Sequence, residues 1–204
     1  TDCRLLPEGG RRHFMTRRFD RTEAGGKLHM QSLAALAHYD YCSPDSYTYE
    51  QAFQVMRRLG LPMDQMEELF RRMTFNVVAR NQDDHVKNIA FLMNRAGEWR
   101  LSPAFDVSYA YNPDGRWTHQ HQMSLNGKRD HFELDDLVRF GVFCGFKPPR
   151  ARAVIEEIHA QVGQWMRFAE QAGVEDPGEW VRANARYEER FGTVFLIRAA
   201  GRTQ

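Results

Sequence analysis

The chain has 204 residues, and 28 lysines and arginines stand against 27 aspartates and glutamates, for a formal net charge of +1. This balance excludes a global field that would favour nucleic acid or a membrane surface. Its length allows one sizeable domain or two small ones. Three cysteines without metal-ligand spacing favour reduced thiols in a cytoplasm, and the sequence has neither a signal-peptide pattern nor an apolar run of membrane-spanning length.

The first segments predict a strand, a loop and a short helix. Residues 13–19 have a roughly alternating pattern, which is typical of a strand. Residues 22–27 contain Gly25-Gly26 and predict a polar loop. A short helix is predicted from the spacing of four apolar residues, Met30, Leu33, Leu36 and Ala37.

Two longer helices are predicted next. Thr48 and Gln51 have the spacing of a capping box, and Gly60 ends the helix that they begin. The apolar face of that helix comprises Ala52, Val55, Met56 and Leu59. Pro62 begins a second helix, whose apolar residues recur at i, i+3, i+4, i+7 and i+11 as Met66, Leu69, Phe70, Met73 and Val77. This helix leads into the most polar loop of the chain.

That loop covers residues 80–88 and lies between the apolar runs 75–79 and 89–93. A polar loop held by buried elements on both sides is a common place for chemistry. Asp83 and Asn88 have the Asp-x4-Asn spacing of a protein-kinase catalytic loop. There the carboxylate takes a proton from a substrate hydroxyl, and the amide oxygen binds Mg2+.

Mg2+ requires a second protein ligand, for which Asp106 in segment 102–108 is the candidate. Residues 89–93 and 99–101 predict two short strands joined by the turn 94–97. A hairpin of this kind would bring Asp106 back beside Asn88. The order of base, amide, hairpin and aspartate is that of a kinase C-lobe.

The remainder, residues 132–200, is predicted to be helical. Before it, residues 117–125 predict a strand with one of His119 and His121 outward and the other packed, in preference to a two-histidine metal site. Helical faces are predicted for Leu134 to Val142, for Pro149 to Gly173 with Trp165 inward, and from Asp176 onward with Trp180 inward. The whole pattern predicts a mainly helical α+β domain with a small hairpin.

Several segments together resemble the HipA family of bacterial serine/threonine kinases, the toxins of HipBA-type toxin–antitoxin pairs. The segments are DDHVKN at 83–88, WRLSPAFDV at 99–107, RFDR at 18–21 and HQMSL at 121–125. The resemblance runs from about residue 17 past Gly173. It implies one HipA-like kinase C-terminal domain over residues 1–204, with residues 13–19 as the hinge-like strand.

The resemblance also implies roles for individual residues. Asp83 would be the general base, although the adjacent Asp84 stays an alternative. His85 and Lys87 would neutralise charge on the transferring phosphoryl group. The remaining assignments are Asn88 and Asp106 as ligands of Mg2+, and Phe19 and Asp20 as residues that bind ATP.

The implied partners are a protein substrate and a HipB-like DNA-binding antitoxin. The family points to an aminoacyl-tRNA synthetase or another translation component as the substrate. No basic helix suited to DNA occurs in the sequence, so we expect DNA contact only through the antitoxin, and no membrane contact.

Two departures limit what the chain is expected to do alone. Asp106 is followed by Val107-Ser108 instead of Phe-Gly, and no Gly-x-Gly-x-x-Gly loop or lysine precedes residue 13. The chain begins at Thr1, and we expect a C-lobe without its N-lobe, weakly active or inactive alone. Two alternatives stay open: a metal-dependent phosphohydrolase or nuclease that uses Asp83, Asp84, His85 and Asp106, and a non-catalytic module that binds an antitoxin.

Overall fold

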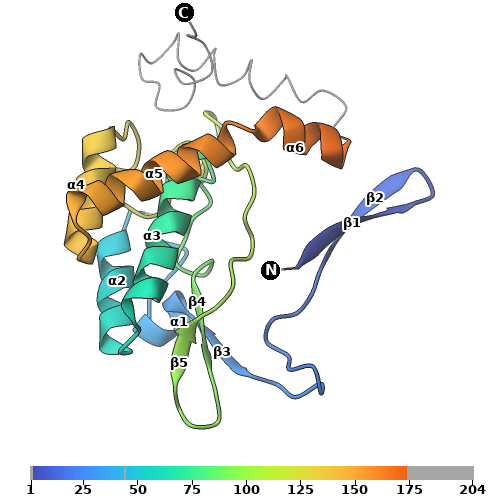
Figure 1. The fold of residues 1–204 in the computed structure, drawn as a ribbon, viewed down its shortest axis with the longest axis horizontal. Helices are drawn as coiled ribbons and strands as arrows, with labels where there is room; N and C mark the ends of the chain where they lie inside the picture. The colour runs from blue at the N-terminus through green and yellow to red at the C-terminus, as the bar shows by residue number, and fades with distance from the viewer. Residues whose placement is uncertain (1, 44, 174–204) are drawn as a thin grey trace, which may run out of the picture.

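The computed structural model describes residues 2–43 and 45–173. Its strands are β1 (Cys3–Glu8), β2 (Arg11–Thr16), β3 (His29–Ser32), β4 (Ala90–Met93) and β5 (Trp99–Leu101). Its helices are α1 (Leu33–Ala37), α2 (Tyr49–Arg58), α3 (Met63–Val78), α4 (Leu134–Cys144), α5 (Pro148–Val162) and α6 (Trp165–Ala172). Helices α2–α5 pack together beside the sheet β3–β5, and the β1–β2 hairpin extends away from them (Figure 1). The predicted α+β class is confirmed.

Helices α2 and α3 form as their sequences predict. The Thr48 side chain accepts a hydrogen bond from the backbone of Gln51, whose own side chain accepts one from the Thr48 backbone. This reciprocal pair satisfies two N–H groups that helix geometry leaves without partners. Helix α3 begins after Pro62, and its five predicted apolar residues are all buried. These two helices supply most of the wall against which the polar loop rests.

Helices α3, α4 and α5 meet at Gly141. A Cβ atom at this position would lie 2.5 Å from Cβ of Ala151 and 3.1 Å from the ring of Phe70, so the helices pack closer than any larger residue permits. Ion pairs join α3 to α5 outside this contact: Glu67 with Arg150, and Arg71 with Glu157. On α4, Val142 was predicted to face inward but is 48% exposed, and Phe140 is buried instead.

The sheet is antiparallel, with strand order β3-β4-β5 and a buried central strand. Strands β4 and β5 form the predicted hairpin, with Phe91 opposite Leu101. Strand β3 was not predicted. Met30 pairs with Leu92 inside it, so the helix predicted from Met30 begins only at Leu33. Spacing of apolar residues cannot separate strand from helix in so short a segment, and the pairing with β4 depends on residues far along the chain.

The β1–β2 hairpin pairs from Cys3 opposite Thr16 to Glu8 opposite Arg11. The strand predicted at residues 13–19 therefore begins at Arg11 and ends at Thr16. Most of the hairpin is exposed, and Phe14 has 69% of its surface accessible. Arg12 donates a hydrogen bond to the carbonyl of Ala172 at 2.5 Å, which links the hairpin to the C-terminal end of α6.

Two predictions in the second half of the chain are wrong. Residues 117–125 form turns and isolated bridges and not a strand, although His119 is exposed and His121 is buried as expected. The long helix predicted up to Gly173 is two helices, because the chain breaks at Gly163, a poor helix former. Trp165 is consequently 37% exposed. The predictions for Asp176 and Trp180 lie outside the described residues.

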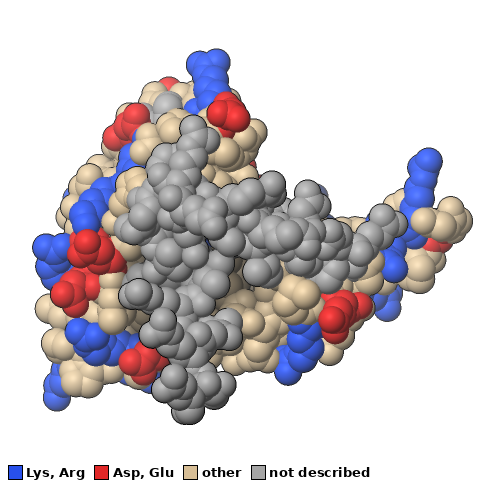
Figure 2. All heavy atoms as spheres, turned by 90° about the horizontal axis from the view of Figure 1, so that it is seen from above, with Lys and Arg blue, Asp and Glu red and all other residues tan. Residues whose placement is uncertain are grey.

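Charges of both signs are mixed over the surface. On the face drawn in Figure 2, basic and acidic side chains alternate, and no broad patch of one sign appears among the coloured residues. This distribution agrees with the formal net charge of +1. In the part of the chain that the structure describes, no helix has the length and apolar character needed to cross a membrane.

Candidate active site

The polar loop leaves α3 without regular secondary structure and turns at residues 86–87, and its side chains alternate between core and surface from Gln82 to Lys87. The buried side chains are Gln82, Asp84 and Val86, and the partly or fully exposed ones are Asp83, His85 and Lys87. The three residues predicted to be catalytic therefore share the outer face of the loop.

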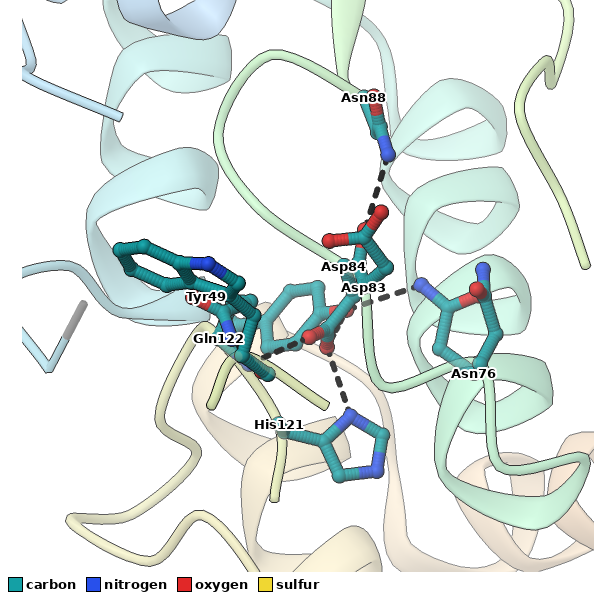
Figure 3. Close-up of polar contacts among 9 residues, drawn as sticks. Tyr49, Asn76, Asp83, Asp84, Asn88, His121 and Gln122 are labelled. Atoms are coloured by element: carbon teal, nitrogen blue, oxygen red, sulfur yellow. Dashed lines mark hydrogen bonds and ion pairs between the residues drawn. The ribbon is translucent and has the colours of Figure 1, made fainter. Parts of the chain in front are cut away.

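Asp84 faces inward and is 3% exposed. Its carboxylate accepts hydrogen bonds from the Tyr49 hydroxyl at 2.7 Å, from Nδ1 of His121 at 2.9 Å and from the backbone N–H of Gln122 at 2.8 Å (Figure 3). These donors come from α2 and from the segment after residue 120. Both oxygens of Asp84 are used in this way, so the carboxylate binds the loop to its surroundings.

The network continues from Tyr49 back to the start of the loop. Nδ2 of Asn76 donates to the Tyr49 hydroxyl oxygen at 3.0 Å, and Oδ1 of Asn76 accepts from Nδ2 of Asn81 at 2.9 Å. The Asn81 backbone N–H also donates to the Asn76 carbonyl. Burial, together with the nearby charge of Asp84, raises the pKa of Tyr49 well above its ordinary value. The phenol therefore keeps its proton.

The outward residues lie next to one another. Oδ1 of Asp83 is 3.9 Å from Nε2 of His85, and the Asp83 side chain is 46% exposed. Nζ of Lys87 lies 4.0 Å from the ring centroid of Tyr41, and the His85 ring lies 6.1 Å from the same ring. His85 thus borders the Asp83 carboxylate, and the exposed Tyr41 ring lies beside both His85 and Lys87.

Asn88 closes the loop onto Asp83. Its Nδ2 donates a hydrogen bond to the main-chain carbonyl of Asp83 at 2.9 Å, and its backbone N–H donates to the carbonyl of His85 (Figure 3). The nitrogen end of the side-chain amide is therefore committed to the protein. The oxygen end is left as the one that can bind a cation.

The segment that contains Asp106 is tied at its two ends to residues at or beside the ends of the loop. Its beginning is fixed by the Ser102 N–H, which donates to the Ala90 carbonyl at 2.8 Å, and its end by the Ala110 N–H, which donates to the Arg80 carbonyl at 3.1 Å. The two hydrogen bonds join the segment to both ends of the loop in antiparallel order. Asp106 is exposed and lies midway between them, with a φ of 53°, a left-handed conformation that Asp tolerates better than most residues.

The residues predicted to bind the nucleotide adjoin this segment. The ring centroid of Phe19 lies 5.7 Å from that of Phe105. The Asp20 carboxylate accepts hydrogen bonds from Arg18, at 2.8 and 2.5 Å, and from Arg21, at 2.6 Å. The hydrogen bond from Arg18 lowers the pKa of Asp20 to about 2. Asp20 thus holds the backbone of its own segment in shape.

The oxygen ligands available suit a small set of metals. Carboxylate and amide oxygens, such as those of Asp106 and Asn88, are the hard ligands that Mg2+ prefers. Among residues 2–43 and 45–173, no three His, Cys, Asp or Glu side chains are grouped to hold a metal ion. A site that is completed by phosphate oxygens and water needs fewer protein ligands than such a cluster supplies.

Sequence reasoning missed the residues that support the site. The capping box that begins α2 gives no role to Tyr49, the pattern leaves open which of His119 and His121 is packed, and no pattern singles out Asn76 or Tyr41. Residue type in 82–87 gives no signal that separates the two aspartates, because Val86 is the one apolar residue of the six. Nothing in the sequence pairs Asp84 with Tyr49, which lies 35 positions away.

Comparison with known proteins found a matching family model and a solved structure of similar fold. A model of the HipA-like C-terminal domain matches residues 1–166. A solved complex of HipA, HipB and operator DNA from the Shewanella oneidensis MR-1 toxin–antitoxin system contains a chain of similar fold, with a TM-score of 0.70 at 18% identity. The match covers 98% of this chain and 54% of that one, so the chain spans about half of its length.

A search of curated proteins found no match. At 18% identity the structural likeness concerns the fold alone. The family model, in contrast, covers most of the sequence, including the loop 80–88 and the segment 102–108. The resemblance noted in the sequence is therefore confirmed, and the chain belongs to the family of HipA-like C-terminal domains.

Proposed function

We propose that the chain is the kinase-like C-lobe of a HipA-type enzyme that phosphorylates serine or threonine with ATP and Mg2+. One observation carries the proposal: hydrogen bonds from Ser102 to Ala90 and from Ala110 to Arg80 tie the two ends of the stretch that contains Asp106 to residues at or beside the two ends of the loop with Asp83 and Asn88. A base and two oxygen ligands on two adjoining segments match the parts that phosphoryl transfer needs.

Asp83 is the proposed general base. It is the outward member of the aspartate pair, and a carboxylate that reaches solvent can accept the proton of a bound hydroxyl. His85 lies beside it and the exposed Lys87 follows in the same loop, and both would offset the charge that develops on the transferring group. Phosphoryl transfer relies on positioning and charge stabilisation, so a few groups on a rigid loop are sufficient.

Asn88 and Asp106 are the proposed ligands of Mg2+. When bound, the metal would bridge phosphate oxygens and neutralise their charge. The chain's own contribution is orientation: the Asn88 amide is fixed by its bond to the Asp83 carbonyl, and the segment that carries Asp106 is held at its two ends by the hydrogen bonds of Ser102 and Ala110.

The nucleotide is proposed to lie beside residues 18–21. Phe19, packed on Phe105, offers apolar surface to a base, and the Asp20 carboxylate shapes the segment through Arg18 and Arg21. The glycine-rich loop and lysine that would cover the phosphates are not in this sequence. We therefore expect the chain alone to bind ATP weakly and to have little or no activity.

Partners follow from the family and are proposals of the same kind. The Shewanella structure contains HipA, HipB and operator DNA, and we propose that this chain, too, associates with a HipB-like antitoxin and contacts DNA only through it. The proposed substrate is a protein of the translation machinery, such as an aminoacyl-tRNA synthetase, in the cytoplasm.

The test is label transfer from γ-labelled ATP to casein, a general acceptor, in Mg2+. The chain is assayed alone and joined to the N-terminal half of a HipA-type protein. We expect activity in the joined form and a loss of about 100-fold or more in Asp83→Asn. Because Asp83 is partly exposed, its replacement should change the free energy of unfolding by no more than about 0.5 kcal/mol.

Asp114→Asn is the matched control, since Asp114 is an exposed aspartate in the loop 111–118. Undiminished labelling by Asp83→Asn would remove Asp83 as the base. Release of free phosphate without labelled protein would favour the phosphohydrolase alternative, which the buried, fully bonded Asp84 already weakens as a metal site. Antitoxin binding without any transfer would favour the non-catalytic module.

A further inference from the structure

The neighbour of the proposed base, Asp84, has an arrangement that the proposed chemistry does not use. Asp84 belongs to the loop and is buried on its inner side, whereas the proposed reaction groups lie on the outer side. Asp84 accepts three hydrogen bonds from parts of the chain that lie 35 to 38 positions away. Burial of a carboxylate costs desolvation free energy unless hydrogen-bond donors compensate for it. The three donors around Asp84 therefore call for an explanation.

The direction of each hydrogen bond can be worked out from the groups involved. The Asn76 side chain accepts through Oδ1 from Asn81, so its nitrogen must be the end that donates to Tyr49. The Tyr49 oxygen therefore accepts a hydrogen bond from Asn76, and the Tyr49 hydroxyl donates its own hydrogen bond to Asp84. The result is a chain of donors that runs from Asn81 to Asp84 without a break.

His121 completes the set from the other side. A carboxylate only accepts, so the proton between His121 and Asp84 resides on Nδ1 of the imidazole. The Gln122 backbone N–H takes the second carboxylate oxygen. Every donor requires Asp84 as an acceptor, and an asparagine at this position would present an NH2 group to at least one of them.

The consequence concerns Asp83. Asn81 and Asp84 are the two ends of one network, so the backbone on both sides of Asp83 is fixed to α2, α3 and residues 121–122. Asp83 stands between the buried Gln82 and Asp84, and with Asp84 held inward its own side chain, which is 46% exposed, reaches the solvent. The main-chain carbonyl of Asp83 then lies where it can accept the bond from Asn88.

We propose that Asp84 is a positioning residue, held by Tyr49 and His121, that directs Asp83 and Asn88 into the reaction face. This inference rests on the proposed function for the roles of Asp83 and Asn88. It assigns Asp84 neither proton transfer nor metal binding. The His121-to-Leu125 block that resembles the HipA family thereby has a physical role, since it supplies two of the three donors.

The experiment compares three variants of the 204-residue chain. Tyr49→Phe removes one donor and keeps the ring, and Asp84→Asn removes the acceptor. Phe53→Leu, in the same helix, disturbs a fully buried ring that contacts Phe140 and has no part in the network. Amide hydrogen exchange is followed by mass spectrometry for peptides that cover residues 80–90 and, as an internal reference, residues 63–78 of α3.

We expect Tyr49→Phe and Asp84→Asn to speed exchange in residues 80–90 by about tenfold while α3 is unchanged, because lost bonds to a charged group free the loop. Phe53→Leu should leave the loop at the wild-type rate. Loop exchange that is unchanged in Asp84→Asn, or raised equally by Phe53→Leu, would overturn the proposal.

The label-transfer assay then separates positioning from chemistry. In the joined form, Tyr49→Phe should lower kcat about tenfold and leave KM for ATP within about twofold, since the misdirected groups act on the transferred phosphoryl group and not on adenine. Unchanged kcat in both variants would contradict the positioning role. Absence of transfer in the wild type would end the proposed function, and the exchange data would still decide whether Asp84 orders the loop.

Discussion

At the scale of single residues, burial separates chemically similar side chains into different roles. The adjacent Asp83 and Asp84 have the same carboxylate, but one is 46% exposed at the side chain and the other 1%. In the same way, His119 is exposed and His121 is buried. Residue type alone therefore does not identify the groups that can reach a substrate.

The cysteines offer a direct check of this separation. Cys3 and Cys42 are exposed, whereas Cys144 is buried in α4, where burial raises the pKa of its thiol well above the ordinary range. The thiolate is the reactive form, so we expect two of the three cysteines to react with a thiol reagent in the native chain. The measurement is a colorimetric thiol titration.

The controls are a titration in guanidinium, where all three thiols should react, and Cys42→Ser, which should reduce the native titre by one. If Cys144 reacts as quickly as the other two, the C-terminal end of α4 opens readily in solution. That outcome would contradict the packing of α4 described above.

At the scale of elements, the sequence predicted those whose signals are local. The capping box of α2, the apolar face of α3 and the hairpin β4–β5 each depend on residues within a few positions of one another, and all three are confirmed. Strand β3 and the break at Gly163 were missed. A segment of four residues is too short for its own pattern to indicate a strand, and β3 forms by pairing with β4. The break at Gly163 was missed because the apolar periodicity of α5 continues past it into α6.

Gly141 allows a test of helix packing. We expect Gly141→Ala to lower the free energy of unfolding by about 1–3 kcal/mol, because a methyl group would collide with Ala151 and Phe70 and push the helices apart. The measurement is urea unfolding followed by tryptophan fluorescence.

Gly163→Ala is the matched control for that substitution. Its φ of −60° suits any residue, and a Cβ there would meet only backbone at ordinary contact distance. We expect it to be neutral or to stabilise by about 0.4–1 kcal/mol, because alanine has less freedom to lose on folding. Equal destabilisation by the two variants would mean that the cost reflects loss of glycine and not crowding at the three-helix contact.

At the scale of the whole molecule, hydrogen bonds and ion pairs between side chains connect segments whose contacts no sequence pattern predicted. Asp136 at the start of α4 accepts hydrogen bonds from Lys128 at 2.6 Å and Arg139 at 2.5 Å, and Glu67 connects α3 to α5. The candidate site shows the same limit. Spacing predicted Asp83, Asn88 and Asp106 as a set, but it did not predict the network from α2, α3 and residues 121–122 that holds Asp84 beside Asp83.

These networks predict how the fold responds to acid. The hydrogen bond from Arg150 lowers the pKa of Glu67, and that from Arg18 lowers the pKa of Asp20 to about 2. Burial would raise the pKa of Asp136, but its hydrogen bonds from Lys128, Glu133 and Arg139 outweigh that effect and lower it. A carboxylate whose folded pKa lies below its unfolded pKa binds fewer protons when folded, so its contribution to stability is lost as the pH falls.

We therefore expect the melting temperature to be nearly constant above about pH 5 and to fall progressively from about pH 4.5 toward pH 2, as the linkage relation requires. Glu67→Gln removes one of the depressed carboxylates and should lower stability at pH 7 while making the decline below pH 4.5 shallower. Glu23→Gln is the control, because the Glu23 side chain is 94% exposed and reaches Arg17 only at 3.8 Å. Melting curves recorded by circular dichroism at half-unit steps of pH give the comparison. A Glu67→Gln curve parallel to that of the wild type would show that the α3–α5 ion pairs do not contribute to acid sensitivity, and would leave Asp136 and Asp20 as its source.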